Sequence, residues 1–344
     1  MNRERLLRFV VPEGVDDPER VSGGNVYDRR VRDGLAAAGW NVTTSEVADA
    51  DAVAAALAQV PGGGTVLVDG LVAGWAPTAV ASAAANVRVV VLAHMVTEAF
   101  AGADPLAAER ERRALGRAGH VVATSNWTAR ELVRRGIVPE RRVTVAMPGA
   151  VEFEVERALD GPAEHGEPGR LLCVGAVAPH KGQDILLDAL GRLDALDWSC
   201  TIAGSRAADP DFAERVAATA APFGSRIRMT GVLGDAELAA AYRSSGVLVA
   251  PSRAESFGMA IADARARGLP VIAARVGGIP ESVAGGGALL VEPDDAGALA
   301  DGLQRWMTDP ALRARLRAEA AGARARSPRW STTVERIDRV LGAA

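Results

Sequence analysis

Short apolar runs of strand length alternate with helical patterns along the whole chain, and this alternation limits the possible folds most. Parallel strands in one sheet need a crossover connection, usually a helix, between them. The pattern therefore predicts an α/β protein with parallel sheets covered by helices. The length of 344 residues exceeds what one hydrophobic core usually serves, so we expect two domains.

The predicted strands form two series. The first series comprises residues 7–11, 41–44, 65–68, 87–92, 120–123 and 143–145, with helices such as 27–38 and 127–135 between them. The second comprises residues 171–174, 199–203, 227–230, 247–250, 271–274 and 288–291, each followed by a helical pattern. Each series predicts one doubly wound, Rossmann-like unit.

A stretch rich in charge, glycine and proline separates the two series. We therefore predict an N-terminal domain over 1–151, a linker over 152–170 and a second domain over 171–325. Residues 326–344 end in apolar side chains at helical spacing, which predicts a C-terminal helix that packs back on the N-terminal domain. Because ligands bind at the carboxyl ends of parallel strands, we expect both sheets to face one cleft.

Composition excludes several classes of protein. The net charge of −4 lacks the basic field of a nucleic-acid-binding protein. Cys173 and Cys200 each lie in an apolar strand, which is typical of free, buried cysteine rather than a disulfide. Residues 1–11 lack the apolar core of a signal peptide, and Asp69 interrupts the most apolar stretch, 66–85. We therefore expect a cytoplasmic protein without a transmembrane segment.

Lys181 is the only lysine in the chain, where every other basic side chain of the Lys/Arg type is arginine. It follows an apolar strand and precedes a helix that we expect to run to residue 196. Helix N-termini at strand ends bind anions. A bound anion would also offset the electrostatic repulsion between the lysine ammonium and the positive end of the helix dipole. The alternative is a solvated surface lysine.

A second group of polar residues follows the strand at 247–250. Glu255 is predicted to lie in the loop, and residues 256–259 to form the first helical turn with free backbone N–H groups. Gly258 allows close approach of a ligand. Asp263 lies seven residues after Ser256, two helical turns on, so both should share one face.

Two carboxylates beside an anion pocket suit a phosphorylated sugar. Carboxylates accept hydrogen bonds from sugar and ribose hydroxyls, while the helix N-terminus binds phosphate. The alternative is structural, with Glu255 capping the helix and Asp263 pairing with Arg267 four residues later.

These motifs resemble family 4 of the retaining glycosyltransferases, which have the GT-B fold of two Rossmann-like domains. The matching segments are 174–182, 202–204, 230–232, 251–263, 268–272 and 277–281, and, more thinly in the first half, 22–24, His94, 123–125 and 148–150.

The resemblance implies a metal-independent, hexosyltransferase-like enzyme that moves a sugar from a nucleotide-sugar donor to an acceptor, with the anomeric configuration retained. No cofactor and no metal site are expected. The resemblance implies catalytic roles for His94, beside the reacting sugar, Glu255, at the sugar hydroxyls, and Lys181, at the diphosphate. The implied donor-binding residues are Gly24, Lys181, Gly204, Val232 near the base, Glu255, Ser256, Phe257, Gly258, Met259 and Asp263 at the ribose.

The chain departs from the family pattern at two positions. Asp263 stands where the family commonly has the longer glutamate, so its ribose contact could be bridged by water. Ala176 stands where the family often has an arginine that contacts the diphosphate. Arg253 and Arg206 are the candidates to replace that charge.

Other functions remain open at this point. A nucleotide-sugar epimerase and a non-catalytic nucleotide-sugar binding protein would share the fold. A nicotinamide-dependent oxidoreductase is excluded because neither 23–24 nor 62–64 fits G-x-G-x-x-G. Arginine-rich segments at 110–117 and 130–142 favour a solvated face over contact with a membrane surface, because glutamates interleave. The donor base and sugar, the acceptor and the oligomeric state are not specified by these motifs.

Overall fold

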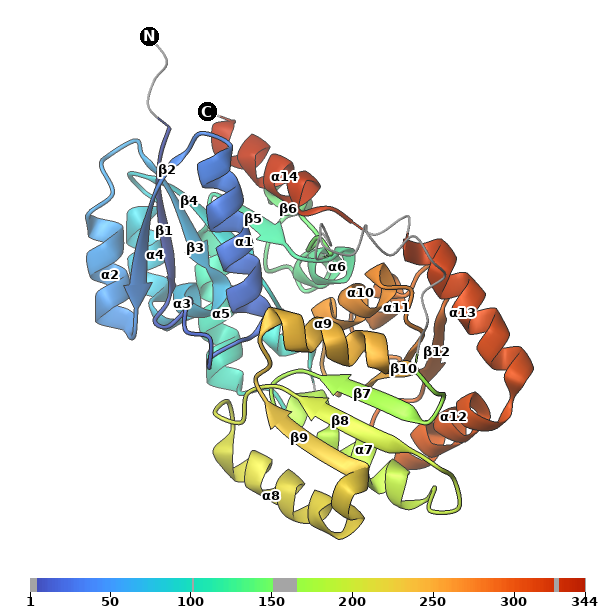
Figure 1. Cartoon of the computed structure of the whole chain (residues 1–344). Helices are drawn as coiled ribbons and strands as arrows, with labels where there is room; N and C mark the ends of the chain where they lie inside the picture. The colour runs from blue at the N-terminus through green and yellow to red at the C-terminus, as the bar shows by residue number, and fades with distance from the viewer. Residues whose placement is uncertain (1–4, 101, 151–165, 325–327, 344) are drawn as a thin grey trace. The chain divides into compact units, whose positions relative to one another are not determined.

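The computed structural model describes residues 5–100, 102–150, 166–324 and 328–343. The chain divides into two compact units, which we call the N-terminal and the C-terminal unit. The N-terminal unit comprises residues 1–17, 23–149 and 328–344, and the C-terminal unit comprises residues 18–22 and 150–327. Each unit contains one sheet with its own helices (Figure 1).

The N-terminal unit contains a six-stranded parallel sheet in the order β2-β1-β3-β4-β5-β6. Its strands are β1 (Leu6–Pro12), β2 (Asn41–Val47), β3 (Thr65–Asp69), β4 (Arg88–Ala93), β5 (His120–Ala123) and β6 (Val143–Val145). Its helices before the linker are α1 (Gly23–Ala37), α2 (Ala50–Ala58), α3 (Gly70–Trp75), α4 (Pro77–Ala83), η1 (Thr97–Ala99), α5 (Pro105–Arg117), α6 (Asn126–Arg134) and η2 (Glu140–Arg142).

The central strands of this sheet are buried on both faces. In β3 and β4, Leu67, Val68, Val90 and Val91 are all inaccessible to solvent. Such continuous valine-rich burial is expected of a parallel sheet with helices on both sides. The sheet is therefore a rigid support for the side chains that follow its carboxyl ends.

The last helix of the chain, α14 (Trp330–Gly342), belongs to the N-terminal unit and contacts α1. The Trp330 ring meets the Tyr27 ring edge to face at 5.5 Å. Trp40 Nε1 donates a hydrogen bond to Asp338 Oδ1 at 2.8 Å. Residues more than 290 positions apart in the chain thus share one core.

The C-terminal unit contains a second six-stranded parallel sheet, in the order β12-β11-β10-β7-β8-β9. Its strands are β7 (Arg170–Val174), β8 (Ser199–Ala203), β9 (Ile227–Gly231), β10 (Val247–Ala250), β11 (Val271–Ala274) and β12 (Ala288–Val291). Its helices are η4 (Pro179–Lys181), α7 (Gln183–Gly191), α8 (Pro210–Ala220), η5 (Ala221–Arg226), α9 (Asp235–Ser244), α10 (Met259–Ala266), α11 (Ile279–Ser282), α12 (Ala296–Thr308) and α13 (Pro310–Arg324).

The two parallel sheets confirm the predicted α/β class, and all twelve predicted strands are present. Cys173 and Cys200 are free and buried, as expected. The helix predicted to run to residue 196 instead ends at Gly191. Beyond it, Trp198 Nε1 donates to the Leu193 carbonyl at 3.0 Å and fixes the turn into β8. Most of the predicted 152–170 linker lies outside the described residues.

Within the described residues, no helix is both long enough and apolar enough to cross a lipid bilayer.

Candidate functional site

The C-terminal unit brings Lys181 and Glu255 together. Lys181 ends η4 after β7, and Glu255 follows β10, which pairs with β7 in the sheet. Lys181 Nζ donates to Glu255 Oε2 at 2.5 Å. Side chains 74 positions apart therefore form one ion pair at the carboxyl ends of two neighbouring strands.

The ion pair keeps Glu255 charged. Burial alone would raise the pKa of its carboxyl group. This effect of burial is outweighed, and the pKa of Glu255 is lowered. The causes are the charge and hydrogen bond of Lys181, the charge of His180 and the hydrogen bond from the backbone N–H of Phe257. At neutral pH the pair is thus a carboxylate acceptor beside an ammonium donor, and both side chains remain partly exposed, at 16% and 25%.

Backbone contacts hold the loops of this pair against each other. The backbone N–H groups of Arg253 and Ala254 both donate to the His180 carbonyl, at 2.8 and 3.2 Å. Gly182 has φ +71°, and a Cβ there would lie 2.3 Å from the Pro251 carbonyl oxygen. Only glycine permits this close approach in a left-handed conformation.

The segment after β11 supports Glu255 from another side. Gly278 N donates to the Glu255 carbonyl at 2.9 Å, and a Cβ on Gly278 would lie 2.0 Å from the Ser256 carbonyl oxygen. The Ser282 hydroxyl donates to the Phe257 carbonyl. These contacts give a physical reason for the paired glycines at 277–278.

Arg253 supports the same two loops. Its guanidinium binds both carboxylate oxygens of Asp184 at 2.8 and 2.9 Å, Asp294 Oδ1 at 2.7 Å and the Pro179 carbonyl at 2.9 Å. Four of the five N–H donors of an arginine are thereby occupied. Arg206, in the loop after β8, is exposed.

The predicted helical turn at 256–259 is wrong, because α10 begins at Met259. Gly258 precedes it with φ +90°, which is incompatible with a right-handed helix. The free N–H groups of the first turn therefore start at Gly258, and Ser256 and Phe257 belong to the buried loop before it. Asp263 lies one helical turn after Met259, and Arg267 Nη1 donates to its backbone carbonyl at 3.0 Å.

Gly204 and Val232 follow the neighbouring strands β8 and β9. Gly204 has φ +154°, and its N–H donates to the Gly231 carbonyl at 2.8 Å. A Cβ there would lie 2.0 Å from the Gly175 carbonyl oxygen, so the ends of β7 and β8 approach closely. Val232 is half-buried directly after β9.

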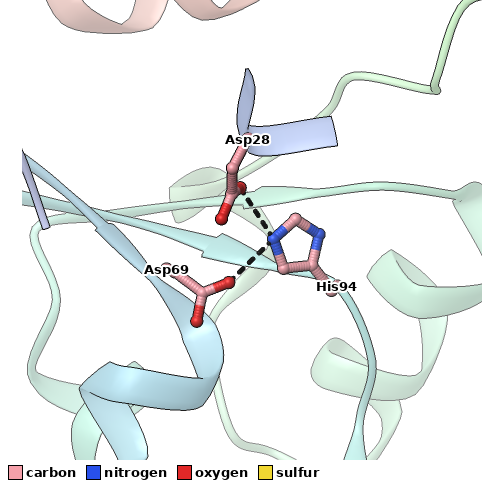
Figure 2. Close-up of side chains that lie close together, drawn as sticks. All are labelled: Asp28, Asp69 and His94. Carbon is pink, nitrogen blue, oxygen red and sulfur yellow. Dashed lines mark hydrogen bonds and ion pairs between the residues drawn. The ribbon is translucent and has the colours of Figure 1, made fainter. Parts of the chain in front are cut away.

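The N-terminal unit places His94 in a cluster that sequence analysis did not predict (Figure 2). His94 follows β4, Asp69 ends β3 and Asp28 lies on α1. His94 Nε2 lies 3.0 Å from Asp28 Oδ1 and 3.0 Å from Asp69 Oδ2. The other oxygen of Asp69 caps α3 by accepting hydrogen bonds from the N–H groups at 71 and 72. Gly24, in the first turn of α1, lies four residues before Asp28.

The cluster strongly changes the pKa values of its members. Burial raises the pKa of Asp28 to about 7, with a further increase from the Asp69 charge, although the His94 charge opposes this. Burial would lower the pKa of His94, but attraction and hydrogen bonds from Asp28 and Asp69 outweigh it and raise the pKa to about 10. Both shifts favour protons bound within the cluster at neutral pH.

Imidazole and carboxylate groups also bind divalent cations, and three such atoms lie within 4.8 Å of one another here. However, one oxygen of Asp28 and one oxygen of Asp69 lie at hydrogen-bond distance from the same atom, Nε2 of His94. One of the two carboxylates also caps a helix. We interpret the cluster as a hydrogen-bonded ion cluster.

Two family models match the chain. Residues 65–150 match "Glycosyltransferase Family 4", and residues 168–309 match "Glycosyl transferases group 1". The second match spans the Lys181–Glu255 pair, and the first spans Asp69 and His94.

Curated relatives include D-inositol 3-phosphate glycosyltransferase 1 of Catenulispora acidiphila, which is 34% identical over 68% of this chain and 60% of the relative. The alpha-D-kanosaminyltransferase of Streptomyces kanamyceticus is 28% identical over 63% of this chain and 58% of the relative. The matches thus span less than two thirds of the length of these relatives.

Solved structures share the fold of the whole chain. The sucrose-phosphate synthase of Thermosynechococcus elongatus matches with a TM-score of 0.79 at 22% identity, covering 98% of each chain. Anabaena HepE, solved in complex with UDP-glucose, matches with a TM-score of 0.73 at 17% identity, covering 98% of this chain and 100% of HepE.

Proposed function

Because this chain belongs to family 4 of the glycosyltransferases and has the GT-B fold, we propose that it transfers a sugar from a nucleoside-diphosphate sugar to an acceptor hydroxyl, with retention of configuration. The observation that carries the proposal is the Lys181–Glu255 pair at the ends of β7 and β10. It offers a cation and a hydroxyl acceptor next to the free N–H groups of α10.

Lys181 is the proposed diphosphate ligand. An ammonium group carries three N–H donors, and Glu255 uses one of them in this structure. The remaining donors can bind phosphate oxygens together with the N–H groups at the start of α10. This positive charge would stabilise the departing nucleoside diphosphate without a divalent ion.

Glu255 and Asp263 are the proposed ligands of hydroxyl groups. Glu255 is ionised beside Lys181, so it accepts from hydroxyls of the transferred sugar. Asp263, one turn into α10 and partly exposed, would accept from the ribose. Gly204 and Val232 would border the base and Gly24 the phosphates, and His94 would contact the reacting sugar.

The donor is identified by measuring thermal unfolding with UDP, GDP, ADP, CDP and dTDP, followed by donor hydrolysis with sugars of the stabilising nucleotide. We expect one nucleoside diphosphate to raise the unfolding temperature, and hydrolysis to continue unchanged in excess EDTA. Stabilisation by NAD(P) alone would contradict the assignment. Activity lost to EDTA and restored by magnesium or manganese would contradict the metal-independent mechanism, and binding without turnover would support a non-catalytic role.

The acceptor screen should start with phosphorylated polyols. The relatives named above include a glycosyltransferase of D-inositol 3-phosphate, so inositol phosphates are the first acceptors to test with the identified donor. Formation of a glycosylated product, detected by mass spectrometry, would support this acceptor class.

A further inference from the structure

A hollow of about 230 Å³ lies between α4 and α5 of the N-terminal unit. Pro77, Thr78 and Ala81 line it from α4, and Arg113 and Arg117 line it from α5. The two arginines lie four residues apart, so their side chains are neighbours on one face of the helix. The small side chains of Thr78 and Ala81 leave the space between the two helices open.

The protein does not compensate the positive charges of this hollow. Arg113 and Arg117 are exposed, and neither guanidinium forms an ion pair or hydrogen bond with a residue that the structure describes. This includes Glu109, which lies four residues before Arg113. The carboxylate of Glu111 is engaged elsewhere, because it accepts from the N–H and the hydroxyl of Thr97 at 2.8 and 3.0 Å. Two like charges four residues apart on a helix repel each other, and an anion between them would relieve the repulsion.

The neighbouring arginine of the same helix is compensated. The guanidinium of Arg112 donates to Glu98 Oε2 at 2.7 Å and to the Arg135 carbonyl at 3.1 Å. Acidic and carbonyl partners are thus supplied on the adjacent face of α5, whereas none of the described residues that line the hollow is acidic. The unpaired charge is therefore a property of the face that borders the hollow and not of the whole helix.

A phosphate group is the anion that suits this arrangement. A guanidinium is a planar fork of N–H donors, which binds two oxygens of one phosphate side by side. A carboxylate carries one charge and would satisfy one such fork. A phosphate monoester carries about −1.5 to −2 charges at neutral pH and so matches two arginines. The Thr78 hydroxyl can donate to a further oxygen. A hollow lined by charges of one sign also concentrates the electrostatic potential within it.

We propose that the hollow between α4 and α5 is a phosphate-binding site, with Arg113 and Arg117 as its cationic ligands and Thr78 as a polar one. The ligand is the phosphate group of a small phosphorylated molecule or of a lipid headgroup, because both present phosphate oxygens to the two guanidinium groups. The site is built by the N-terminal unit and includes neither Lys181 nor Glu255. It therefore does not rest on the proposed transfer of a sugar.

Thermal unfolding in inorganic phosphate tests the site. Phosphate replaces chloride at constant ionic strength, and the rise in unfolding temperature gives an apparent affinity. We expect Arg113→Gln and Arg117→Gln each to weaken this affinity at least about tenfold, since each removes charged hydrogen bonds. The series is repeated in the Lys181→Gln protein, so that phosphate bound at the proposed donor site does not contribute.

Arg110→Gln is the matched control. Arg110 is an exposed arginine of α5 that does not line the hollow, so its substitution makes the same change in charge and should preserve phosphate affinity. If Arg110→Gln weakens phosphate binding as much as Arg113→Gln does, the effect is a general one of charge and the proposal is overturned.

Ala81→Leu separates a built site from a basic surface. The longer side chain fills part of the hollow without changing any charge, and leucine is a good helix former. We expect phosphate affinity to fall as it does in Arg113→Gln, while the unfolding temperature in chloride stays close to that of the wild type. Full phosphate affinity in Ala81→Leu would overturn the proposal.

Vesicles distinguish the two sources of phosphate. Co-sedimentation is measured with vesicles of phosphatidylcholine alone and of phosphatidylcholine with phosphatidylglycerol. Binding to the anionic vesicles that is lost in Arg113→Gln but kept in Arg110→Gln would assign the site to a lipid headgroup. Stabilisation by inorganic phosphate without vesicle binding would assign it to a small phosphorylated ligand. If neither probe distinguishes the wild type from Arg113→Gln, the hollow is not a phosphate site.

Discussion

Two ion clusters stand out at the scale of single residues. Each is assembled from side chains that lie far apart in the sequence, Lys181 with Glu255 and Asp28 with Asp69 and His94. Because buried charges are costly unless they are paired, removing one member affects the protonation of the others. For each substitution in these clusters, ligand affinity, kcat and their pH dependence should therefore be measured together.

Lys181→Gln should weaken binding of the nucleoside diphosphate without unfolding the protein. A hydrogen bond to a charged group contributes about 1.5–3 kcal/mol, which corresponds to a loss of roughly 10- to 150-fold in affinity. Isothermal titration calorimetry at neutral pH measures the affinity for the nucleoside diphosphate. Arg192→Gln, just beyond α7 and exposed, should bind like the wild type. Equal affinity in both variants would show that Lys181 is a surface residue.

Glu255→Gln and Asp263→Asn should have opposite effects. Contacts to the transferred sugar strengthen as charge develops at its anomeric carbon, whereas ribose contacts are similar in ground and transition states. Glu255→Gln should therefore reduce kcat far more than affinity for the bare nucleoside diphosphate, and Asp263→Asn should do the reverse. Asp263→Glu should preserve or mildly improve nucleotide affinity. If Glu255→Gln and Asp263→Asn leave affinity and kcat intact, the proposed donor site is wrong.

The contribution of His94 to stability should depend on pH. Its folded-state pKa of about 10 lies above the ordinary value near 6.5, so the stabilisation is fully present below about pH 6.5 and is lost as pH rises through about 10. The difference in free energy of unfolding between wild type and His94→Asn should shrink across this range. Urea denaturation at several pH values measures this difference in the free energy of unfolding. A difference that does not change with pH would contradict the raised pKa of His94.

Glycines determine the geometry at the scale of the elements. The loops after β7, β10 and β11 approach each other so closely that a Cβ at Gly182 or Gly278 would overlap a carbonyl oxygen. The left-handed Gly258 delays the start of α10 and leaves Ser256 and Phe257 in a buried loop. Glu255 is thus positioned by backbone contacts rather than by a helix.

Gly278→Ala should disturb the loop that holds Glu255. The new Cβ would lie 2.0 Å from the Ser256 carbonyl oxygen, so the loop must shift. We expect a lower unfolding temperature and weaker nucleotide binding, measured by differential scanning fluorimetry with and without ligand. Gly322→Ala in α13 is the matched control, because a Cβ there meets nothing within 4 Å and alanine favours the helix by about 0.5–1 kcal/mol. Equal effects of the two substitutions would contradict this role of Gly278.

At the scale of the whole molecule, the chain builds two units, each with a six-stranded parallel sheet. The core of the N-terminal unit includes α14, because Trp330, Ile337 and Leu341 of this helix are buried. Its fold therefore depends on residues from both ends of the sequence.

Ile337→Ala should destabilise the N-terminal unit by about 2–5 kcal/mol, because it deletes most of a side chain that is inaccessible to solvent. Glu335→Ala, an exposed position on the same helix, should change stability little. Thermal and urea denaturation of both variants measure the difference. Equal stability of the two variants would show that α14 is not part of the core.

Much of the fold could be predicted from the sequence, because a buried parallel strand is an apolar run that can be read locally. The twelve strands, the α/β class and the helix at the C-terminal end follow from such runs and from helical spacing. The positions of Lys181 and Glu255 after strands were likewise visible. These features depend on neighbours within a few residues of each other.

Only the tertiary structure decided which side chains meet. Strand order brings Asp69 and His94 to adjacent strand ends, and the packing of α1 adds Asp28. Loop paths engage Arg253 with Asp184 and Asp294. Such contacts join residues tens of positions apart, and their partners depend on strand order and backbone approach, which no local pattern in the sequence encodes.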